Sequence, residues 1–528
     1  MKNRFFNASK FFIIFFLIIS VILPLIKLIS VVKFSDIIQI VSSPQFDNML
    51  FNSIFTTLIS TFISVSLAWV LAWCINRSNM KHKSIFSVLF TLPMLIPSIS
   101  HGMGLVLLLG DNGLITNLFD INIGLYGYKG IILGSLLYSF PVAFLMLTDA
   151  FKYEDYTVYE AASVLGLNNF QKFKKITFPN MKKTLISVIF AVFTMIFTDY
   201  GVPLVVGGKI MTIPVYMYRE VIGLLDFSKG AIIGMILLIP AFIAFIFDLR
   251  SEDDTNASTV TKPYIIQKNK SRDLFCSIFC ILIVFLICLP LIAFAILSFV
   301  SQYPVDMKIS LLNLKKYLNL GIGNYMINSL AISLLTSLVG TSIVYYTAYI
   351  TARSKKSFSI NFLHFISMIS LAIPGIVLGL SYALFFRQSI IYGTLAILVL
   401  VNTVHFFASP YLLAYNSLCV FNEKLEDVAD VLGITRFKML CDVYIPCTAN
   451  TIIEIFSYLF VNSMVTISAV SFLANFKNMP LALMIPQFDA QSLIGATSFI
   501  SLIIFIINLF SKLIIYVSKR YLIKMQNI

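Results

Sequence analysis

Long apolar runs separated by short polar stretches make up most of the chain. A helix that crosses the roughly 30 Å hydrocarbon core of a bilayer needs about 20 apolar residues. The pattern therefore predicts membrane-spanning helices, six on each side of one longer polar stretch. They lie near 11–32, 50–74, 85–109, 130–150, 184–204, 229–248, 274–300, 326–351, 360–386, 394–419, 451–473 and 493–517.

The longest strongly polar stretch is 249–272, which is rich in charge, Ser and Thr and cannot bury a core. We interpret it as a linker between two halves. The expected domains are 1–248, the linker 249–272, and 273–528. The first run, 11–32, lacks a small-residue cleavage site, so we interpret it as a signal anchor.

A polar stretch that must lie outside the bilayer separates two runs of the first half. It reads EAASVLGLNNFQKFKKITFP, from Glu160 to Pro179. We expect a helix over 153–165, a left-handed turn at Gly166, and a second short helix capped by the asparagines at 168–169. Pro179 should stop that second helix. The stretch therefore predicts two short helices in an elbow.

The same layout returns in the second half as DVADVLGITRFKMLCDVYIP, Asp427 to Pro446. Gly433 lies 267 positions after Gly166, and Pro446 lies 267 positions after Pro179. Prolines at 97 and 374, and at 141 and 410, also correspond, at shifts of 277 and 269. Two elbows in one register indicate a duplicated chain.

The first elbow resembles the EAA loop of permeases from binding-protein-dependent ABC importers, through Glu160, Ala161, Ala162, Gly166, Ile176 and Pro179. The second elbow matches at Asp427, Ala429, Gly433 and Pro446, and departs at Val428 and Val443. In that family the loop couples the permease to a soluble ATPase. The resemblance therefore implies that these residues of both elbows contact an ATPase.

The whole chain resembles the fused, double-length permeases of the ferric-iron, 2-aminoethylphosphonate and thiamine group. FTDYGVPLVVGG and SMVTISAVSFL are similar to stretches that recur there. The resemblance implies an all-α polytopic membrane protein of two six-helix repeats with the type I, MetI-like permease fold. About 12 transmembrane helices would then surround a pseudo-two-fold axis along the membrane normal.

Composition excludes a soluble globular protein, because 59% of the residues are hydrophobic and only 12% are charged. The net charge of +14 is spread over short loops, which argues against a nucleic-acid partner. Most Lys and Arg fall on the side of the elbows, the linker and both termini. By the positive-inside rule that side is cytoplasmic. We expect a multi-pass protein of a bacterial inner or plasma membrane.

The chain has no Walker A sequence, so ATP and Mg²⁺ should bind to a separate partner, and we expect no cofactor here. The resemblance implies a homodimeric cytoplasmic ABC ATPase and an extracytoplasmic solute-binding protein. The 4 His and 7 Cys do not have metal-ligand spacing, and no catalytic constellation occurs. The chain is therefore expected to be a transport subunit, not an enzyme.

Two polar groups are candidates for the translocation path. Asp199 and Tyr200 precede the helix-breaking run GVPLVVGG, and Asn462, Ser463 and Thr466 cluster on the corresponding helix of the second half. Irregular backbone at membrane depth is tolerated where it lines a cavity. Placement at the outer interface for Asp199, and interhelical hydrogen bonding for the second group, remain the alternatives.

The expected function is ATP-driven import by alternating access. The solute would be 2-aminoethylphosphonate or ferric iron, with thiamine as a further candidate. An ion-coupled secondary transporter is the alternative. It predicts ionisable groups at mid-membrane, where this chain has few. A membrane-embedded enzyme is disfavoured because no catalytic group stands out.

Overall fold

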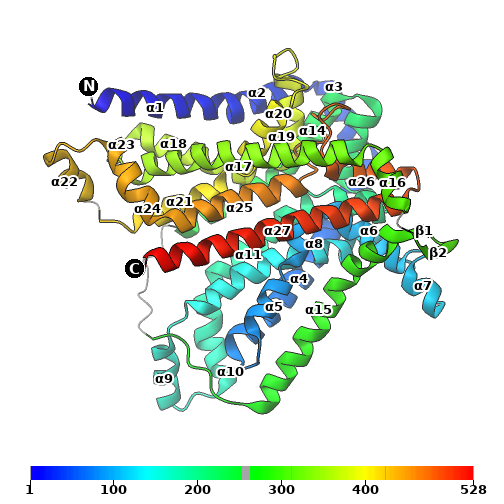
Figure 1. Cartoon of the computed structure of the whole chain (residues 1–528), viewed down its shortest axis with the longest axis horizontal. Coiled ribbons are helices and arrows are strands. Elements are labelled where there is room, and N and C mark those ends of the chain that lie inside the picture. The colour runs from blue at the N-terminus through cyan, green and yellow to red at the C-terminus, as the bar shows by residue number, and fades with distance from the viewer. Residues whose placement is uncertain (1, 253–261, 311, 423, 527–528) are drawn as a thin grey trace. The chain divides into compact units, whose positions relative to one another are not determined.

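A computed structural model describes residues 2–252, 262–310, 312–422 and 424–526 of the chain (Figure 1). Residues 253–261, in the middle of the predicted linker, lie outside this description. The described chain is almost entirely helical, apart from a short hairpin of β1 (Val300–Gln302) and β2 (Asp306–Ile309). The predicted all-α polytopic fold is confirmed.

The chain forms two compact units, which we name after the repeat that supplies most of each. The first-repeat unit comprises 43–216 and 242–308, and the second-repeat unit comprises 1–42, 217–241 and 309–528. Each unit thus includes a segment from the other half of the sequence. The predicted boundaries divide the chain into its two sequence repeats. The compact units divide it by contacts between helices, and so combine segments of both repeats.

The first-repeat unit is built around the pair α4 and α8. Its elements are α4 (Pro44–Arg77), α5 (Lys83–Leu89), α6 (Ser98–Leu109), α7 (Leu114–Phe119), α8 (Tyr128–Lys152), α9 (Tyr156–Val164), α10 (Asn169–Lys172), α11 (Phe178–Phe197), α12 (Gly201–Val206), α13 (Ile213–Tyr218), which ends in the other unit, and α15 (Lys270–Phe299), together with β1 and β2.

The second-repeat unit is built around α17, α25 and α27, which lie side by side in Figure 1. Its elements are α1 (Lys2–Leu17), α2 (Leu23–Ser30), α3 (Phe34–Val41), α16 (Leu312–Asn319), α17 (Ile322–Ala352), α18 (Phe358–Ile369), α19 (Gly375–Phe385), α20 (Leu395–His405), α21 (Ala408–Cys419), α22 (Leu425–Val431), α23 (Arg436–Met439), α24 (Ile445–Cys447), α25 (Ala449–Val465), α26 (Met484–Ala490) and α27 (Ile494–Gln526). The helix α14 (Phe227–Glu252) belongs to both units.

Small residues at every fourth position let the central helices of each unit approach closely. On α4 they are buried at Thr56, Ser60, Ser64, Ala68 and Ala72, and the Ser64 hydroxyl lies 2.8 Å from that of Ser139 on α8. On α17 the corresponding row is Ser329, Ser333, Ser337 and Thr341. Because lipid gives no hydrophobic drive for helix association, close contact and hydrogen bonds hold such helices together.

Helices from one half of the sequence pack within the unit of the other half. The helix α15, which begins the second half, lies so close to α6 that a Cβ on Gly104 would be 2.6 Å from Cβ of Pro290. In the second-repeat unit, the Tyr382 hydroxyl of α19 donates a 2.7 Å hydrogen bond to the carbonyl of Ser20, which precedes α2. The first helix of each half is therefore part of the other half's packing unit.

Within the described residues, eight helices are long and apolar enough to cross a membrane, or eleven if each of three bent pairs counts as one span. The bent pairs cover the predicted spans 360–386, 394–419 and 451–473, and the first of them bends by 110°. The remaining predicted span, 229–248, corresponds to α14, whose apolar part 227–243 is shorter. Most predicted spans thus coincide with a helix or a bent helix pair. The bounds predicted at 85–109 are wrong, because Pro93 and Pro97 break the helix there and the span of the structure is Ser98–Phe119. The helix α25 also ends at Val465, before the predicted end at 473.

Candidate functional site

The first elbow consists of α9, a left-handed glycine and a second helical segment. Asp155 caps α9 by accepting from the N–H of Thr157 at 2.9 Å. Gly166 has φ +73°, and no other atom lies within 4 Å of where its Cβ would be. Asn168 then starts α10 with a capping box, in which Asn168 and Gln171 each accept from the backbone N–H of the other.

The second elbow repeats this backbone with the same register. Gly433 has φ +69°, and the N–H of Ile434 donates to the carbonyl of Ala429 at 2.8 Å. In the first elbow, the N–H of Leu167 donates to the carbonyl of Ala162 at 3.0 Å. These bonds close the end of the first short helix in each copy. The predicted left-handed glycine turns are confirmed at both positions.

The prediction that Pro179 stops the second short helix is wrong. A π-helical turn, Phe173–Thr177, follows α10 and leads directly into α11, so that 169–197 is one span. Pro179 directly follows the π-helical turn, whose irregular hydrogen bonding accommodates a residue without an N–H inside a continuous span. The second elbow has the same π-helical turn at Leu440–Tyr444, but there the helix bends by 81° between Cys447 and Ala449.

The alanines of the motif do not share one role. Ala162 and its counterpart Ala429 are buried, and Ala162 packs with Tyr159 and Ile176 in a small core inside the elbow. Ala161 is exposed. Ala161 therefore faces outward and Ala162 inward, because adjacent residues of a helix point to different sides.

Both elbows expose apolar side chains at the same three positions. In the first elbow these are Val164, Leu165 and Phe170, which are 89%, 78% and 73% exposed. In the second they are Val431, Leu432 and Phe437, at 86%, 68% and 63%. Each set surrounds the glycine turn, which forms the tip of the elbow. A clustered exposed apolar patch of this kind is typical of a protein interface.

The acidic residues of the motif lie at the rim of each elbow. Glu160 is half exposed and forms a 2.5 Å ion pair with Lys262 of the linker. Asp427 is more exposed and lies 4.0 Å from Lys355. Because both carboxylates are exposed, a partner's basic groups can reach them. Exchange of the present lysine for such a group would cost little, since exposed ion pairs contribute little to stability.

A buried ion pair anchors the first elbow. Arg77, the last residue of α4, pairs with Glu154, which precedes α9, and both side chains are almost fully buried. The Tyr159 hydroxyl donates to Glu154 at 3.0 Å and shares a 2.8 Å hydrogen bond with Thr177. Burial raises the pKa of Tyr159, so its hydroxyl stays a proton donor. The network joins α4, α9 and the π-helical turn.

A corresponding ion pair anchors the second elbow. Arg353 follows α17 and contacts Glu426 through two nitrogens, at 2.7 and 2.5 Å. It also donates to the carbonyls of residues 418, 421 and 422. The Tyr444 hydroxyl donates to Glu426 at 2.5 Å. Burial disfavours the charged form of Glu426, but the bonds from Arg353 and Tyr444 outweigh burial and lower its pKa.

Sequence analysis placed Glu154 in the expected helix 153–165 but assigned no anchoring role to any of these four charged residues. Arg77 and Arg353, which follow the predicted spans 50–74 and 326–351, were counted only among the basic residues that indicate orientation. A signal was nevertheless present. Each arginine closes a long apolar run, and a glutamate, Glu154 or Glu426, lies within or just before the following elbow.

Asp199 and Tyr200 lie where α11 ends and α12 begins. The Asp199 carboxylate accepts from the N–H groups of Gly201 and Val202, at 3.3 and 3.0 Å, and from the side chain of Ser98. These contacts cap α12 and satisfy the carboxylate of Asp199. Tyr200 is buried. A role of either residue in the translocation path stays a prediction.

The second polar group lies at the end of α25 in the other unit. Asn462 donates to the carbonyl of Tyr458 in its own helix at 2.8 Å, and Thr466 forms the C-terminal cap. The buried Ser463 hydroxyl has no hydrogen-bond partner among the described residues. The structure therefore brings these three residues together, while their contact with a solute stays a prediction.

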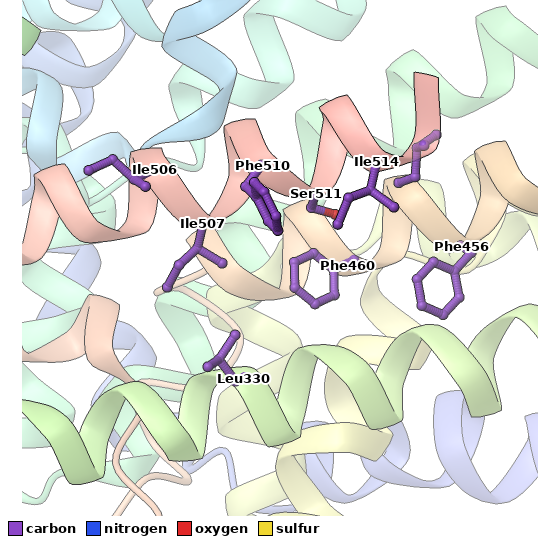
Figure 2. Close-up of a pocket in the computed structure, with 9 residues that line it drawn as sticks. Leu330, Phe456, Phe460, Ile506, Ile507, Phe510, Ser511 and Ile514 are labelled. Atoms are coloured by element: carbon purple, nitrogen blue, oxygen red, sulfur yellow. The ribbon is translucent and has the colours of Figure 1, made fainter. Parts of the chain in front are cut away.

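An apolar groove of about 440 Å³ lies among α17, α25 and α27. Figure 2 shows the rings of Phe456, Phe460 and Phe510 along it, with Leu330 opposite. Ser511 is its single polar lining residue. The groove thus offers few groups that could bind a charged solute. Among the described residues, no three His, Cys, Asp or Glu side chains form a group that could hold a metal ion.

Comparison with known proteins identifies related permeases. The ferric transport system permease protein of Actinobacillus pleuropneumoniae is 28% identical over 413 residues, which is 74% of this chain and 58% of the relative. A putative ferric transport system permease protein of Haemophilus influenzae is 28% identical over 411 residues, or 74% of this chain and 64% of the relative. The chain thus spans less than two thirds of the length of these relatives.

A thiamine transport system permease protein of Brucella suis is 27% identical over 139 residues, a quarter of each chain. The family model described as "Binding-protein-dependent transport system inner membrane component" matches residues 64–252 and again 344–524. Each match includes one elbow, so the predicted duplication and the predicted resemblance are confirmed. Because the two matches cover more than half of the chain, the protein belongs to the family of inner membrane components of binding-protein-dependent transport systems.

Proposed function

We propose that the chain is the membrane-spanning subunit of an ATP-driven importer, and that each elbow binds one subunit of a homodimeric ABC ATPase in the cytoplasm. The observation that carries the proposal is the apolar triad repeated at both elbow tips, Val164, Leu165 and Phe170 with Val431, Leu432 and Phe437. A soluble partner can bury these side chains, and the rim carboxylates Glu160 and Asp427 can pair with its basic groups.

The anchors explain how an elbow would transmit force. Each buried arginine closes a long central helix, α4 or α17, and binds the elbow through a glutamate. A movement imposed on the elbow by ATP binding would therefore pass directly to that helix. The mechanism we propose is alternating access, in which a path through the chain opens in turn to each side of the membrane.

The substrate and the remaining partner follow from the relatives. Family membership supports an extracytoplasmic solute-binding protein that delivers the solute. The two ferric permeases align with 74% of the chain, whereas the thiamine permease aligns with a quarter, so we propose ferric iron ahead of thiamine. 2-Aminoethylphosphonate stays a prediction from sequence resemblance. Uptake of each solute into vesicles that contain the full complex distinguishes the three.

Binding of the ATPase tests the proposal. Leu165→Asp and Leu432→Asp place a charge in the tip of one elbow each. Ile390→Asp is the matched control, because Ile390 is a fully exposed apolar residue of the α19–α20 loop. We expect each elbow variant to lower co-purification of the co-expressed ATPase at least about tenfold, since a buried unpaired charge costs several kcal/mol, and the control to leave it unchanged.

Equal co-purification by all three variants would contradict an ATPase site at the elbows. Uptake that continues without ATP and follows an ion gradient would instead support the alternative, an ion-coupled secondary transporter.

A further inference from the structure

The linker between the repeats lies against the first elbow. The N–H of Tyr156, at the start of α9, donates a 2.9 Å hydrogen bond to the carbonyl of Lys262. The Lys262 side chain forms the ion pair with Glu160 and lies 5.5 Å from the centre of the Tyr156 ring. Lys262 therefore contacts α9 through both its backbone and its side chain.

Tyr264 inserts its ring into the core of the same elbow. It packs edge to face against Tyr156 and Tyr159, with ring centres 5.2 and 5.1 Å apart. Its face covers the guanidinium of Arg77, whose central carbon lies 3.3 Å from the ring centre. An arginine stacked on an aromatic ring is stabilised by the negative face of the ring, most strongly where water is excluded.

The first anchor needs such a cover because its own hydrogen bonding is incomplete. Nη1 of Arg77 and Oε1 of Glu154 are buried and have no hydrogen-bond partner among the described residues. Arg353, by contrast, donates to Glu426 twice and to three carbonyls. A buried charge with unsatisfied donors is unstable unless another group compensates. Of the three aromatic rings around Arg77 in the described residues, that of Tyr264 lies closest.

The second elbow supplies its own aromatic ring. Tyr444 lies over Arg353 at 5.4 Å and belongs to the π-helical turn of that elbow. The residue at the corresponding position of the first elbow, 267 places earlier, is Thr177. A threonine is too short to cover an arginine. The ring centres of Phe151 and Tyr159 lie 5.4 and 5.8 Å from the central carbon of Arg77, and the linker adds the closest ring, that of Tyr264 at 3.3 Å.

We infer that Tyr264 and Lys262 are positioning residues of the first elbow, so that the linker is part of the coupling site as well as a tether. This inference rests on the proposed function only for its effect on the ATPase; its effect on the elbow stands alone. Tyr264 keeps the ion pair of Arg77 closed, and Lys262 holds α9 at Glu160.

Hydrogen exchange of the full-length chain in lipid nanodiscs, without ATPase, tests the inference. Tyr264→Ala should speed exchange of amides in 156–176 about tenfold, which corresponds to about 1.4 kcal/mol. Amides in 425–444 should be unaffected. Tyr264→Phe keeps the ring face and should restore slow exchange. Ile265→Ala is the matched control, because Ile265 is adjacent to Tyr264 and its side chain is half exposed. Its exchange rates should equal those of the unsubstituted protein.

Lys262→Ala should have a smaller effect, about twofold or threefold, because its ion pair is half exposed. Equal exchange in the Tyr264→Ala and Ile265→Ala variants would overturn the inference. A Tyr264→Phe variant as defective as Tyr264→Ala would also overturn it, since the argument rests on the ring face.

The same variants are then assayed for binding to the co-expressed ATPase. Faster exchange in Tyr264→Ala together with weaker ATPase binding supports both the inference and the proposed function. Faster exchange with unchanged ATPase binding supports the positioning role and contradicts the coupling role of the first elbow. The two failures are therefore distinguishable.

Discussion

The two elbows have nearly the same backbone but stabilise it with different side chains. Both have a left-handed glycine at the tip, a closing hydrogen bond across it, and a five-residue π-helical turn at the corresponding place. Both are anchored by an arginine at the end of a long central helix. The groups that bind this arginine, however, occupy different sequence positions.

The carboxylate and the phenol of the anchor occupy different sequence positions in the two copies. In register, Tyr159 corresponds to Glu426, and Thr177 corresponds to Tyr444. The first elbow therefore has its phenol on the first short helix and takes its carboxylate from Glu154, whereas the second has its carboxylate on that helix and its phenol on the π-helical turn. The comparison teaches that the anchor is defined by a spatial arrangement of groups, and different residues can supply it.

Removal of each arginine gives the largest expected effect and tests whether the anchors are equivalent. Breaking a buried ion pair costs about 3–5 kcal/mol. We expect Arg353→Ala to destabilise its elbow by the upper value, because three carbonyls lose their donor as well. Arg77→Ala should destabilise the first elbow by the lower value. The measurement is the free energy of opening from hydrogen exchange of each elbow. Lys355→Ala, on a highly exposed side chain, is the control.

Removal of each tyrosine hydroxyl tests the exchange of roles. Tyr444→Phe deletes a hydrogen bond to a charged carboxylate, which is worth about 1.5–3 kcal/mol. Tyr159→Phe deletes bonds to both Glu154 and Thr177 and should destabilise the first elbow by a similar amount. Each variant should affect its own elbow only. A variant with no effect on exchange would show that its hydroxyl is not part of the anchor.

The N-terminal caps of the second short helices should contribute somewhat different free energies to the two elbows. The first elbow has a complete capping box at Asn168 and Gln171, whereas Thr435 accepts a single bond from the N–H of Lys438 at 3.2 Å. Replacement of an N-cap by alanine costs about 0.5–2 kcal/mol. We expect Asn168→Ala to cost more than Thr435→Ala, as measured by exchange of amides in α10 and α23. The reverse order would contradict this comparison of the caps.

The last expected effect is the pH dependence of the second elbow's stability, which should be absent at neutral pH and appear only in acid. The pKa of Glu426 is lowered in the folded protein from its ordinary value of 4.5. Its stabilising contribution is therefore fully present above about 4.5 and is lost as pH falls through the lowered pKa. The opening free energy of the second elbow should be constant near neutral pH and fall below about 4.5. In Glu426→Gln that fall should be absent, and its persistence would assign it to another group.

Sequence analysis located most of the spans, the duplication and both elbow tips, because these depend on local signals. Apolar runs, glycine at a left-handed turn and asparagine at a cap act within a few residues. The stop predicted at Pro179 failed because the π-helical turn before it accommodates a residue without an N–H, so that the helix continues. The predicted coupling and pathway roles of the site residues stay predictions.

The sequence by itself determined that this is a duplicated, helical membrane protein with two elbows in one register, since hydrophobic periodicity and turn chemistry are local properties. Only the tertiary structure showed that Arg77 is bound by Glu154 and covered by Tyr264, residues 77 and 187 positions away. Likewise, only the folded chain places α15 against α6 and Tyr382 against Ser20. Contacts between distant residues depend on how helices pack, and no local pattern encodes which of several equally apolar or equally charged partners will meet.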